Sequence, residues 1–311
     1  MKITFTEAPK AEILGFLIDQ GGKLPSEAAA LDEESGGLLT EALTSGGFRG
    51  KTAQTASIVL PKDASAKRAI LIGGGKPSER DNRAWETIGA TVYKSQANAG
   101  FKTLSLSIAD ADAATRVALG VKLAAYRFDD YRTKQKSEDK PTLNAVSIVT
   151  DDVKAARAAF KPLSAGADGT YLARDLVNMP PNDLYPASYA AKIEALSEHG
   201  LEIEILGEKE LKKLGMNSML GVGQGSVKES KLGIMKWMGG KKGDAPVALV
   251  GKGVCFDTGG ISLKPGAGME DMRGDMGGSA AVVGAMLSLA KRKAKANVVG
   301  LVGLVENMPD G

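Results

Sequence analysis

The stretch VGKGVCFDTGGISLKPGAGMEDMRGDMGG, residues 250–278, is the part of the sequence around which the rest is organised. Its nine glycines disfavour helix and strand, since each interior Gly costs about 0.5–1 kcal/mol relative to Ala. The stretch therefore predicts a long ordered loop, and such loops in compact domains are usually functional or disordered. It also carries the carboxylates of Asp257, Glu270, Asp271 and Asp275, which are hard oxygen ligands. These features indicate a cation site.

Apolar runs border this stretch on both sides. Residues 247–250 and 297–305 have the composition of buried strands, and a helical pattern lies between them, which together predict a βαβ unit. Ligands of open parallel sheets lie outside the carboxyl ends of the strands. Lys252 and Asp257 follow the first strand, and Asp275 just precedes the helix. We therefore expect these three side chains to converge on one point.

Five segments of the sequence carry a resemblance to a known family. They are GKGVCFDTGGISLKP (251–265), MRGDMGGSAAV (272–282), NMPPNDLYP (178–186), GVGQGS (221–226) and ENMPDG (306–311). In content and order they resemble the leucyl aminopeptidase (cytosol aminopeptidase) family. The resemblance is strong over residues 165–311 and is limited to the general pattern in the N-terminal part.

The resemblance implies roles for five residues. Lys252, Asp257 and Asp275 occupy metal-ligand positions of the family. Lys264 matches a catalytic lysine, and Met272 matches a position lining the side-chain pocket. A lysine coordinates metal only when neutral, and an adjacent dication can supply the required pKa shift. Lys264 is instead expected to stay protonated and to stabilise an oxyanion.

The activity implied by the resemblance is that of a metalloexopeptidase. It would release N-terminal residues from peptide substrates, leucine preferred, through a water activated by two divalent metal ions, zinc or manganese. The resemblance also implies a homo-hexamer when the protein is full length.

The sequence departs from the family pattern at its end. The family carries a further motif of the form NTDAEGR shortly downstream, which supplies another Asp ligand, a bridging Glu and an arginine that holds bicarbonate. This motif is not among the 311 residues. We therefore expect a chain truncated before the C-terminal part of the catalytic domain, and a 311-residue polypeptide that is weakly metallated and inactive.

The sequence as a whole predicts a two-domain α/β protein. Alternating apolar and amphipathic runs predict an N-terminal α/β domain, macro-like, at residues 1–165, with a largely parallel sheet. Residues 166–311 are expected to form the N-terminal part of a catalytic metallopeptidase domain with a mostly parallel central sheet. The boundary is expected in the Gly-, Ala- and Ser-rich segment 162–169. The strands expected in the first domain are 3–5, 12–18, 56–60, 68–72, 103–108 and 145–150, and its helices are 35–44, 82–97 and 111–126.

Composition excludes several classes of protein. The net charge of +3 is too balanced to imply a polyanionic partner, so nucleic-acid binding is possible but unsupported. A single cysteine, Cys255, suits a reducing compartment. The sequence shows no signal peptide and no apolar segment of membrane-spanning length, which predicts a cytoplasmic protein without a membrane partner. With one histidine, His199, a His-rich zinc site is impossible.

Alternative interpretations stay open at this point. The chain could be a DNA-binding or regulatory protein, or a non-catalytic member of the same family. Without the motif, Lys252 and Lys264 would be ordinary surface lysines, and Asp275 a favourable charge near a helix start. Cys255 is expected to be a small buried hydrophobe rather than a nucleophile. Glu306 ends a predicted strand at the same sheet edge and is a candidate for contact with the metal ligands.

Overall fold

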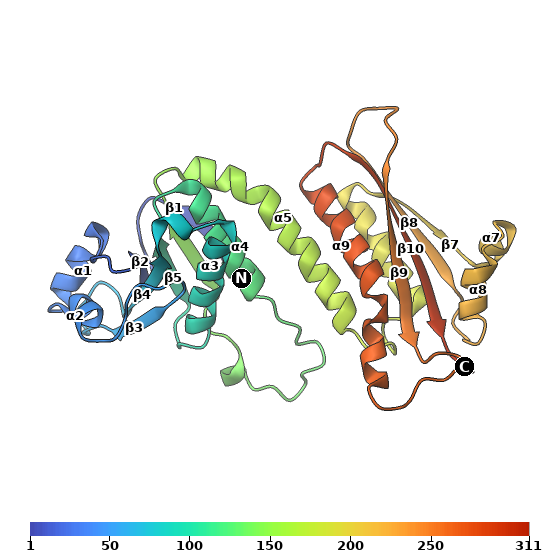
Figure 1. The fold of residues 1–311 in the computed structure, drawn as a ribbon, viewed down its shortest axis with the longest axis horizontal. Coiled ribbons are helices and arrows are strands. Elements are labelled where there is room, and N and C mark those ends of the chain that lie inside the picture. Colours follow the sequence, from blue (N-terminus) through green and yellow to red (C-terminus); the bar gives the residue numbers. More distant parts are fainter. Residues whose placement is uncertain (311) are drawn as a thin grey trace. The chain divides into compact units, whose positions relative to one another are not determined.

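The computed structural model describes residues 1–310. The chain divides into two compact units, Met1–Ser164 and Ala165–Gly311. Each unit contains its own sheet and its own hydrophobic core (Figure 1). Among the described residues, no helix combines the length and apolar character that a membrane span requires.

The first unit is built on a six-stranded sheet in the order β1-β6-β5-β2-β4-β3. The strands are β1 (Lys2–Thr6), β2 (Ile13–Asp19), β3 (Thr55–Val59), β4 (Arg68–Gly75), β5 (Thr103–Ser107) and β6 (Ala145–Val149). All neighbouring strands are parallel except β3, which pairs with β4 in the antiparallel sense. The expected largely parallel sheet is confirmed for this unit.

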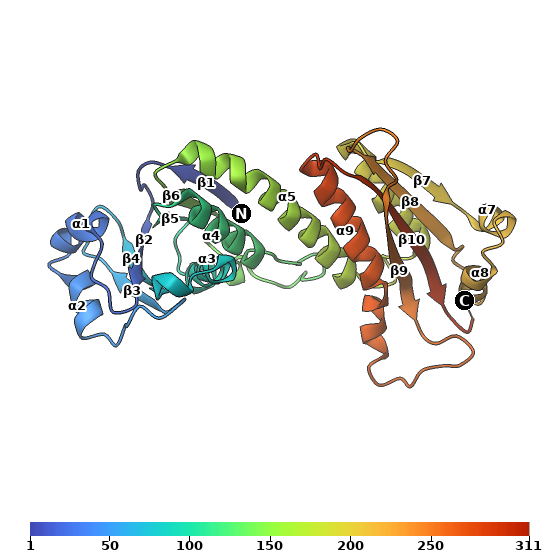
Figure 2. The same cartoon turned by 45° about the horizontal axis from the view of Figure 1, so that its top comes forward.

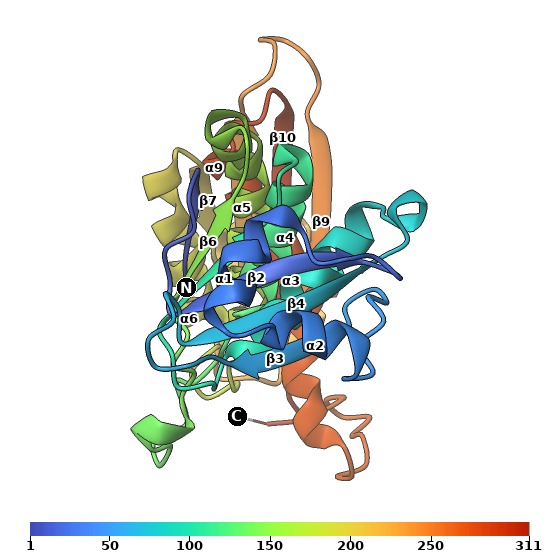
Figure 3. The ribbon, with the colours of Figure 1, turned by 90° about the vertical axis from the view of Figure 1, so that its left-hand side faces the viewer.

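Helices cover both faces of the first sheet. Helices α3 (Asn82–Gln96) and α4 (Ala111–Ala124) lie over one face (Figure 2). Helices α1 (Ala29–Glu34) and α2 (Leu38–Thr44) lie over the other, against β2, β3 and β4 (Figure 3). Strand β4 serves both cores, because Ile70 and Ile72 belong to one apolar cluster while Leu71 belongs to the other. This alternation is the two-residue period of a strand buried on both faces.

Helix α5 (Val153–Asn178) runs through the segment 162–169, in which the domain boundary is expected. The division after Ser164 falls inside that segment, within a continuous helix. An interior proline such as Pro162 costs about 3 kcal/mol in a helix. Packing explains why the helix continues: Phe160 packs in the core of the first unit, and Leu176 in that of the second.

The second unit contains a four-stranded sheet in the order β7-β8-β10-β9. The strands are β7 (Glu202–Leu206), β8 (Lys231–Met238), β9 (Val247–Asp257) and β10 (Asn297–Asn307). Only β9 and β10 are parallel, while β7–β8 and β8–β10 are antiparallel. In the described residues the expectation of a mostly parallel sheet is thus wrong here. A long helical crossover, which parallel neighbours need, joins only β9 to β10, through α9 (Gly277–Lys291).

Shorter helices complete the second unit. They are α6 (Pro186–Glu194), α7 (Glu208–Lys213) and α8 (Asn217–Gly223). Together with α5 and α9 they give the mixed α/β architecture expected from the sequence.

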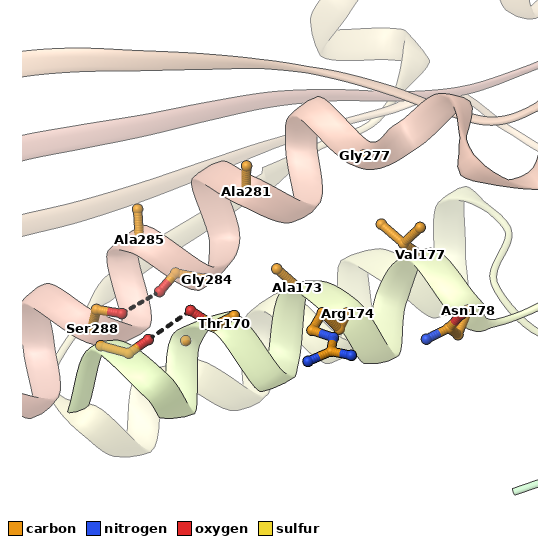
Figure 4. A pocket seen from close by; sticks show the side chains of 12 residues that line it. Thr170, Ala173, Arg174, Val177, Asn178, Gly277, Ala281, Gly284, Ala285 and Ser288 are labelled. Carbon is orange, nitrogen blue, oxygen red and sulfur yellow. Dashed lines mark hydrogen bonds between the residues drawn. The ribbon is translucent and has the colours of Figure 1, made fainter. Parts of the chain in front are cut away.

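The C-terminal part of α5 packs closely on α9. A Cβ on Gly169 would lie 2.1 Å from the carbonyl oxygen of Gly284, and one on Gly284 would lie 2.3 Å from that of Gly169. Beside this crossing is a groove of about 630 Å³, lined mainly by small residues (Figure 4). The hydroxyls of Thr170 and Ser288 are turned back onto the carbonyls of their own helices, at 3.0 and 2.8 Å. The glycines therefore serve helix packing here.

Two ionisable side chains lie deep in the second core. Tyr189 is 0% exposed and Cys255 is 1% exposed. The Ser279 hydroxyl donates to the Met276 carbonyl oxygen at 2.7 Å, so the Tyr189 hydroxyl, 3.0 Å from Ser279 Oγ, must donate to it. Burial raises the pKa of the Tyr189 phenol, and burial together with the nearby Glu306 carboxylate raises that of the Cys255 thiol. Both groups stay neutral in the folded protein. The expected burial of Cys255 is confirmed.

These two groups should make the second unit sensitive to alkali. Their folded-state pKa values lie above the ordinary values of 9.0 for Cys and 10.0 for Tyr. The unfolded chain therefore releases their protons first, and stability present below pH 9 is lost as the pH rises further. Each group contributes at most about 1.4 kcal/mol per pH unit. Tyr189→Phe should flatten this dependence above pH 10, and Cys255→Ala should flatten it from pH 9.

The measurement is urea unfolding between pH 8 and 12. A Trp85→Phe background leaves Trp237 as the single tryptophan, so that its fluorescence follows the second unit. An identical pH dependence in Tyr189→Phe and its parent would show that the phenol ionises equally in both states.

Candidate functional site

The glycine-rich stretch is not one long loop, contrary to the expectation. Strand β9 continues to Asp257, and residues 269–276 form a 3₁₀ helix, η5 (Met269–Met276). The cause is tertiary pairing with β10, which extends from Val247 to Asp257 with one shift of register at Cys255 and outweighs the low strand propensity of glycine. Within residues 250–278, only residues 258–268 lie outside helices and strands.

Two glycines in β9 allow helix α9 and strand β10 to approach the backbone of β9 closely. A Cβ on Gly251 would lie 2.6 Å from Ser279 Cα and 2.7 Å from the Gly278 carbonyl oxygen. A Cβ on Gly253 would lie 2.4 Å from the carbonyl oxygen of Gly303 in β10. The missing side chain at Gly251 brings the start of α9 against β9, next to Lys252.

The structure brings together Lys252, Asp257 and Asp275. Lys252 Nζ contacts Asp275 Oδ2 and lies 3.9 Å from Asp257 Oδ2. Lys264 joins the same cluster, because its Nζ lies 2.9 Å from Asp257 Oδ2. Two ammonium groups thus face two carboxylates at the carboxyl end of β9.

Asp257 is the central member of this cluster. Its side chain is only 14% exposed. Burial alone would raise the pKa of this carboxyl, but hydrogen bonds, led by the one from Lys264, lower the pKa to about 2. Oδ1 accepts from the Gly259 amide at 3.1 Å and from Asn307 Nδ2 at 2.7 Å. Asp257 is therefore an anion at neutral pH, and its Oδ2 faces the lysines.

Lys264 and Met272 are in contact. Lys264 Nζ lies 3.1 Å from Met272 Sδ. The backbone folds Lys264 back toward the strand end, since its amide donates to the Thr258 carbonyl oxygen at 2.8 Å. This turn needs Gly259, which has a φ of +94° and whose Cβ would lie 2.3 Å from the Ser262 carbonyl oxygen. Met272 therefore borders the cluster.

The other candidate residues lie elsewhere. Glu270 and Asp271 are exposed residues of η5. Glu306 is 9% exposed, and its Oε2 accepts a hydrogen bond of 2.6 Å from Ser226 Oγ. The described contacts of Glu306 are thus with Ser226 and, through its charge, with Cys255. The residue that reaches the cluster from β10 is instead its neighbour, Asn307, which sequence reasoning missed.

Gly251→Ala should separate the two sides of the cluster. The added methyl group would overlap backbone atoms of Gly278 and Ser279, and such overpacking typically costs about 1–3 kcal/mol. Gly266 is the matched control, because its Cβ would meet nothing within 4 Å and its φ is not positive. Thermal unfolding should show a lower Tm for Gly251→Ala and little change for Gly266→Ala. Equal Tm values would mean that α9 can shift without cost.

Two family models match the chain. Residues 171–311 match the catalytic domain of the cytosol aminopeptidase family, and residues 13–135 match the N-terminal domain of the same family. The chain belongs to the cytosol aminopeptidase family. The resemblance carried by the sequence motifs is thereby confirmed.

Curated relatives of this cytosol aminopeptidase family member cover its whole length. Probable cytosol aminopeptidases of Caulobacter vibrioides and Agrobacterium fabrum are 49% and 48% identical to it. The alignments cover 100% and 99% of this chain and 64% of each relative. The chain thus spans 64% of the length of these relatives.

Solved structures show the same fold. The bottromycin maturation enzyme BotP in complex with Mn has a TM-score of 0.79 and 30% identity, and the match covers 97% of this chain and 61% of that chain. A mutant of tomato leucine aminopeptidase has a TM-score of 0.82 and 24% identity, with coverage of 99% and 63%. At this identity, the second likeness concerns the fold alone.

Proposed function

We propose that this chain is part of a metal-dependent aminopeptidase that releases N-terminal residues, leucine preferred, from peptides. The observation that carries the proposal is the meeting of Lys252, Asp257, Asp275 and Lys264 at the carboxyl end of β9. Family membership supports the aminopeptidase class of activity.

The donor set fits a cation. The ammonium nitrogen of Lys252 already lies by Asp275 and within 3.9 Å of Asp257, so positive charge is accommodated where two carboxylates face each other. Within the described part of the chain, no three His, Cys, Asp or Glu side chains gather into a metal-binding group. The ligands that residues 1–310 offer are therefore the two carboxylates and, once neutral, the Lys252 amine.

Each side chain has a distinct part in the proposed reaction. Asp257, Asp275 and Lys252 would hold divalent cations. When bound, a cation pair would lower the pKa of a shared water and polarise the scissile carbonyl. Lys264 would donate a hydrogen bond to the developing oxyanion. Met272, which touches Lys264, would line a tolerant apolar pocket for the leucine side chain.

Manganese or zinc is the proposed metal, and the manganese complex of BotP supports the former. In the full-length protein, bicarbonate is proposed as a further group, and a cytoplasmic homo-hexamer as its assembly. Three ligands are too few to hold two cations firmly, so we propose that the 311-residue polypeptide by itself is weakly metallated and inactive.

Hydrolysis of leucine p-nitroanilide in the presence of Mn²⁺ tests the proposal. The full-length protein should release the anilide, and chelation should stop the reaction. An N-acetylated substrate should not be cleaved, because a blocked amine cannot bind as a free α-amine does. Rapid metal-dependent turnover by the 311-residue polypeptide would contradict its proposed inactivity, and a full-length protein without activity toward any free-amine substrate would contradict the aminopeptidase itself.

A further inference from the structure

Asn307, the last residue of β10, is bound directly to Asp257. Its Nδ2 donates to Asp257 Oδ1 at 2.7 Å. The Gly259 amide donates to the same oxygen at 3.1 Å. Oδ1 thus has two neutral donors, while Oδ2 faces Lys264 at 2.9 Å and Lys252 at 3.9 Å. The two oxygens of one carboxylate face two different environments.

A strand irregularity gives Asn307 this position. Val305 pairs with Val254, but Glu306 pairs with Phe256, so that Cys255 is an extra residue in β9. Such bulges re-aim side chains and are frequent beside active sites. After the bulge, Asn307 lies opposite Asp257.

The backbone of Asn307 is fixed as well. Its carbonyl oxygen accepts from the Thr258 amide at 3.0 Å and from Thr258 Oγ1 at 2.8 Å. The carboxamide packs against Gly260, whose Cβ would lie 2.6 Å from Asn307 Oδ1. The site therefore leaves room for Asn307 only because residue 260 has no side chain.

We propose that Asn307 is a positioning residue that holds Asp257 Oδ1, so that Oδ2 is the oxygen presented to the cation. The inference rests on the proposed function. Asn307 itself touches neither cation nor substrate and acts through the orientation of Asp257. Neighbours that orient metal ligands typically contribute 10–100-fold to metal affinity, and a loss of this size is expected without Asn307.

The test is Mn²⁺ binding by isothermal titration calorimetry of the full-length protein. Asn307→Leu keeps the size of the side chain and removes its donor, and its Kd for Mn²⁺ should rise about 10–100-fold. Asn297→Leu is the matched control at the other end of β10. Asn297 Nδ2 donates to the carbonyl oxygens of Lys241 and Asp244 at 2.9 and 3.1 Å, so this variant should lose stability but keep its Mn²⁺ affinity.

A second pair of variants leaves Asn307 in place. Gly260→Ala would displace the carboxamide, whereas Gly268→Ala has free space around its Cβ. Both glycines have positive φ, +68° and +78°, so backbone strain is matched. Only Gly260→Ala should weaken Mn²⁺ binding. At saturating Mn²⁺, the hydrolysis rates of Asn307→Leu and Gly260→Ala should recover to within about threefold of the wild-type rate, because the reacting groups are intact.

The outcomes separate the inference from the function. If the wild-type protein binds Mn²⁺, and Asn307→Leu and Gly260→Ala bind it with the same affinity, the positioning role is overturned and the aminopeptidase proposal stays intact. A wild-type protein that binds no Mn²⁺ or Zn²⁺ would overturn both. If Asn307→Leu does not fold, by circular dichroism, the Gly260→Ala and Gly268→Ala pair decides.

Discussion

Asp257→Ala should reduce the affinity of the full-length protein for Mn²⁺ by more than about 100-fold and abolish peptide hydrolysis with it. This carboxylate lies at the centre of the cluster, within reach of both lysines, and hydrogen bonds hold its pKa at about 2. It is therefore a permanent anion at neutral pH. Its removal would leave Asp275 as the only described carboxylate in contact with Lys252. A single carboxylate supplies too few hard ligands for a divalent ion.

Metal content after equilibrium dialysis checks this result. Asp271→Ala is the matched control, because Asp271 is an exposed carboxylate of the same glycine-rich stretch and should not affect binding. Unfolding temperatures of both metal-free variants would separate lost ligands from lost structure. Retention of bound Mn²⁺ in Asp257→Ala would remove Asp257 from the ligand set and require another centre for the site.

Lys264→Ala should lower kcat by about 10²–10³-fold while metal binding is kept. Loss of a single donor to an oxyanion has effects of this size. The Lys264 ammonium approaches Asp257 Oδ2 at 2.9 Å and Met272 Sδ at 3.1 Å, which places it between the ligand cluster and the proposed side-chain pocket. Because a cation repels a metal ion, its removal should not weaken Mn²⁺ binding.

Lys252→Ala provides the contrast. Lys252 contacts Asp275 and is proposed as an amine ligand, so its loss should lower Mn²⁺ affinity as well as kcat. Steady-state kinetics at several Mn²⁺ concentrations distinguish the two lysines, since excess metal should rescue Lys252→Ala in part and Lys264→Ala not at all. Equal loss of metal in both variants would contradict this division of roles.

Much of the site could be predicted because its parts are local in sequence. The apolar runs around the glycine-rich stretch predict β9, α9 and β10, and their order brings Lys252, Asp257 and Asp275 to one sheet edge. The failures concern glycine. The sequence pattern predicts a loop at Gly251 and Gly253, yet both lie in β9, where neighbouring backbones approach too closely for a Cβ. Local propensity does not contain that information.

Long-range pairing accounts for the other differences. Asn307 lies opposite Asp257 only because of the bulge at Cys255, and no local pattern in β10 indicates a shift of register. From the sequence alone, Glu306 is the more obvious candidate, because it is a carboxylate at the end of the predicted strand. Helix α5 continues through Pro162 because both of its halves pack in a core, which the composition of the segment 162–169 does not reveal.

The burial of Cys255 has a practical consequence for spectroscopy. It is the one thiol of the chain, it is almost fully covered, and its raised pKa keeps it protonated under ordinary labelling conditions, in which only thiolates react. Cysteines introduced at exposed positions of either unit would therefore accept maleimide dyes or nitroxide spin labels selectively. The natural sequence can serve as the background for such probes, with its native thiol left in place.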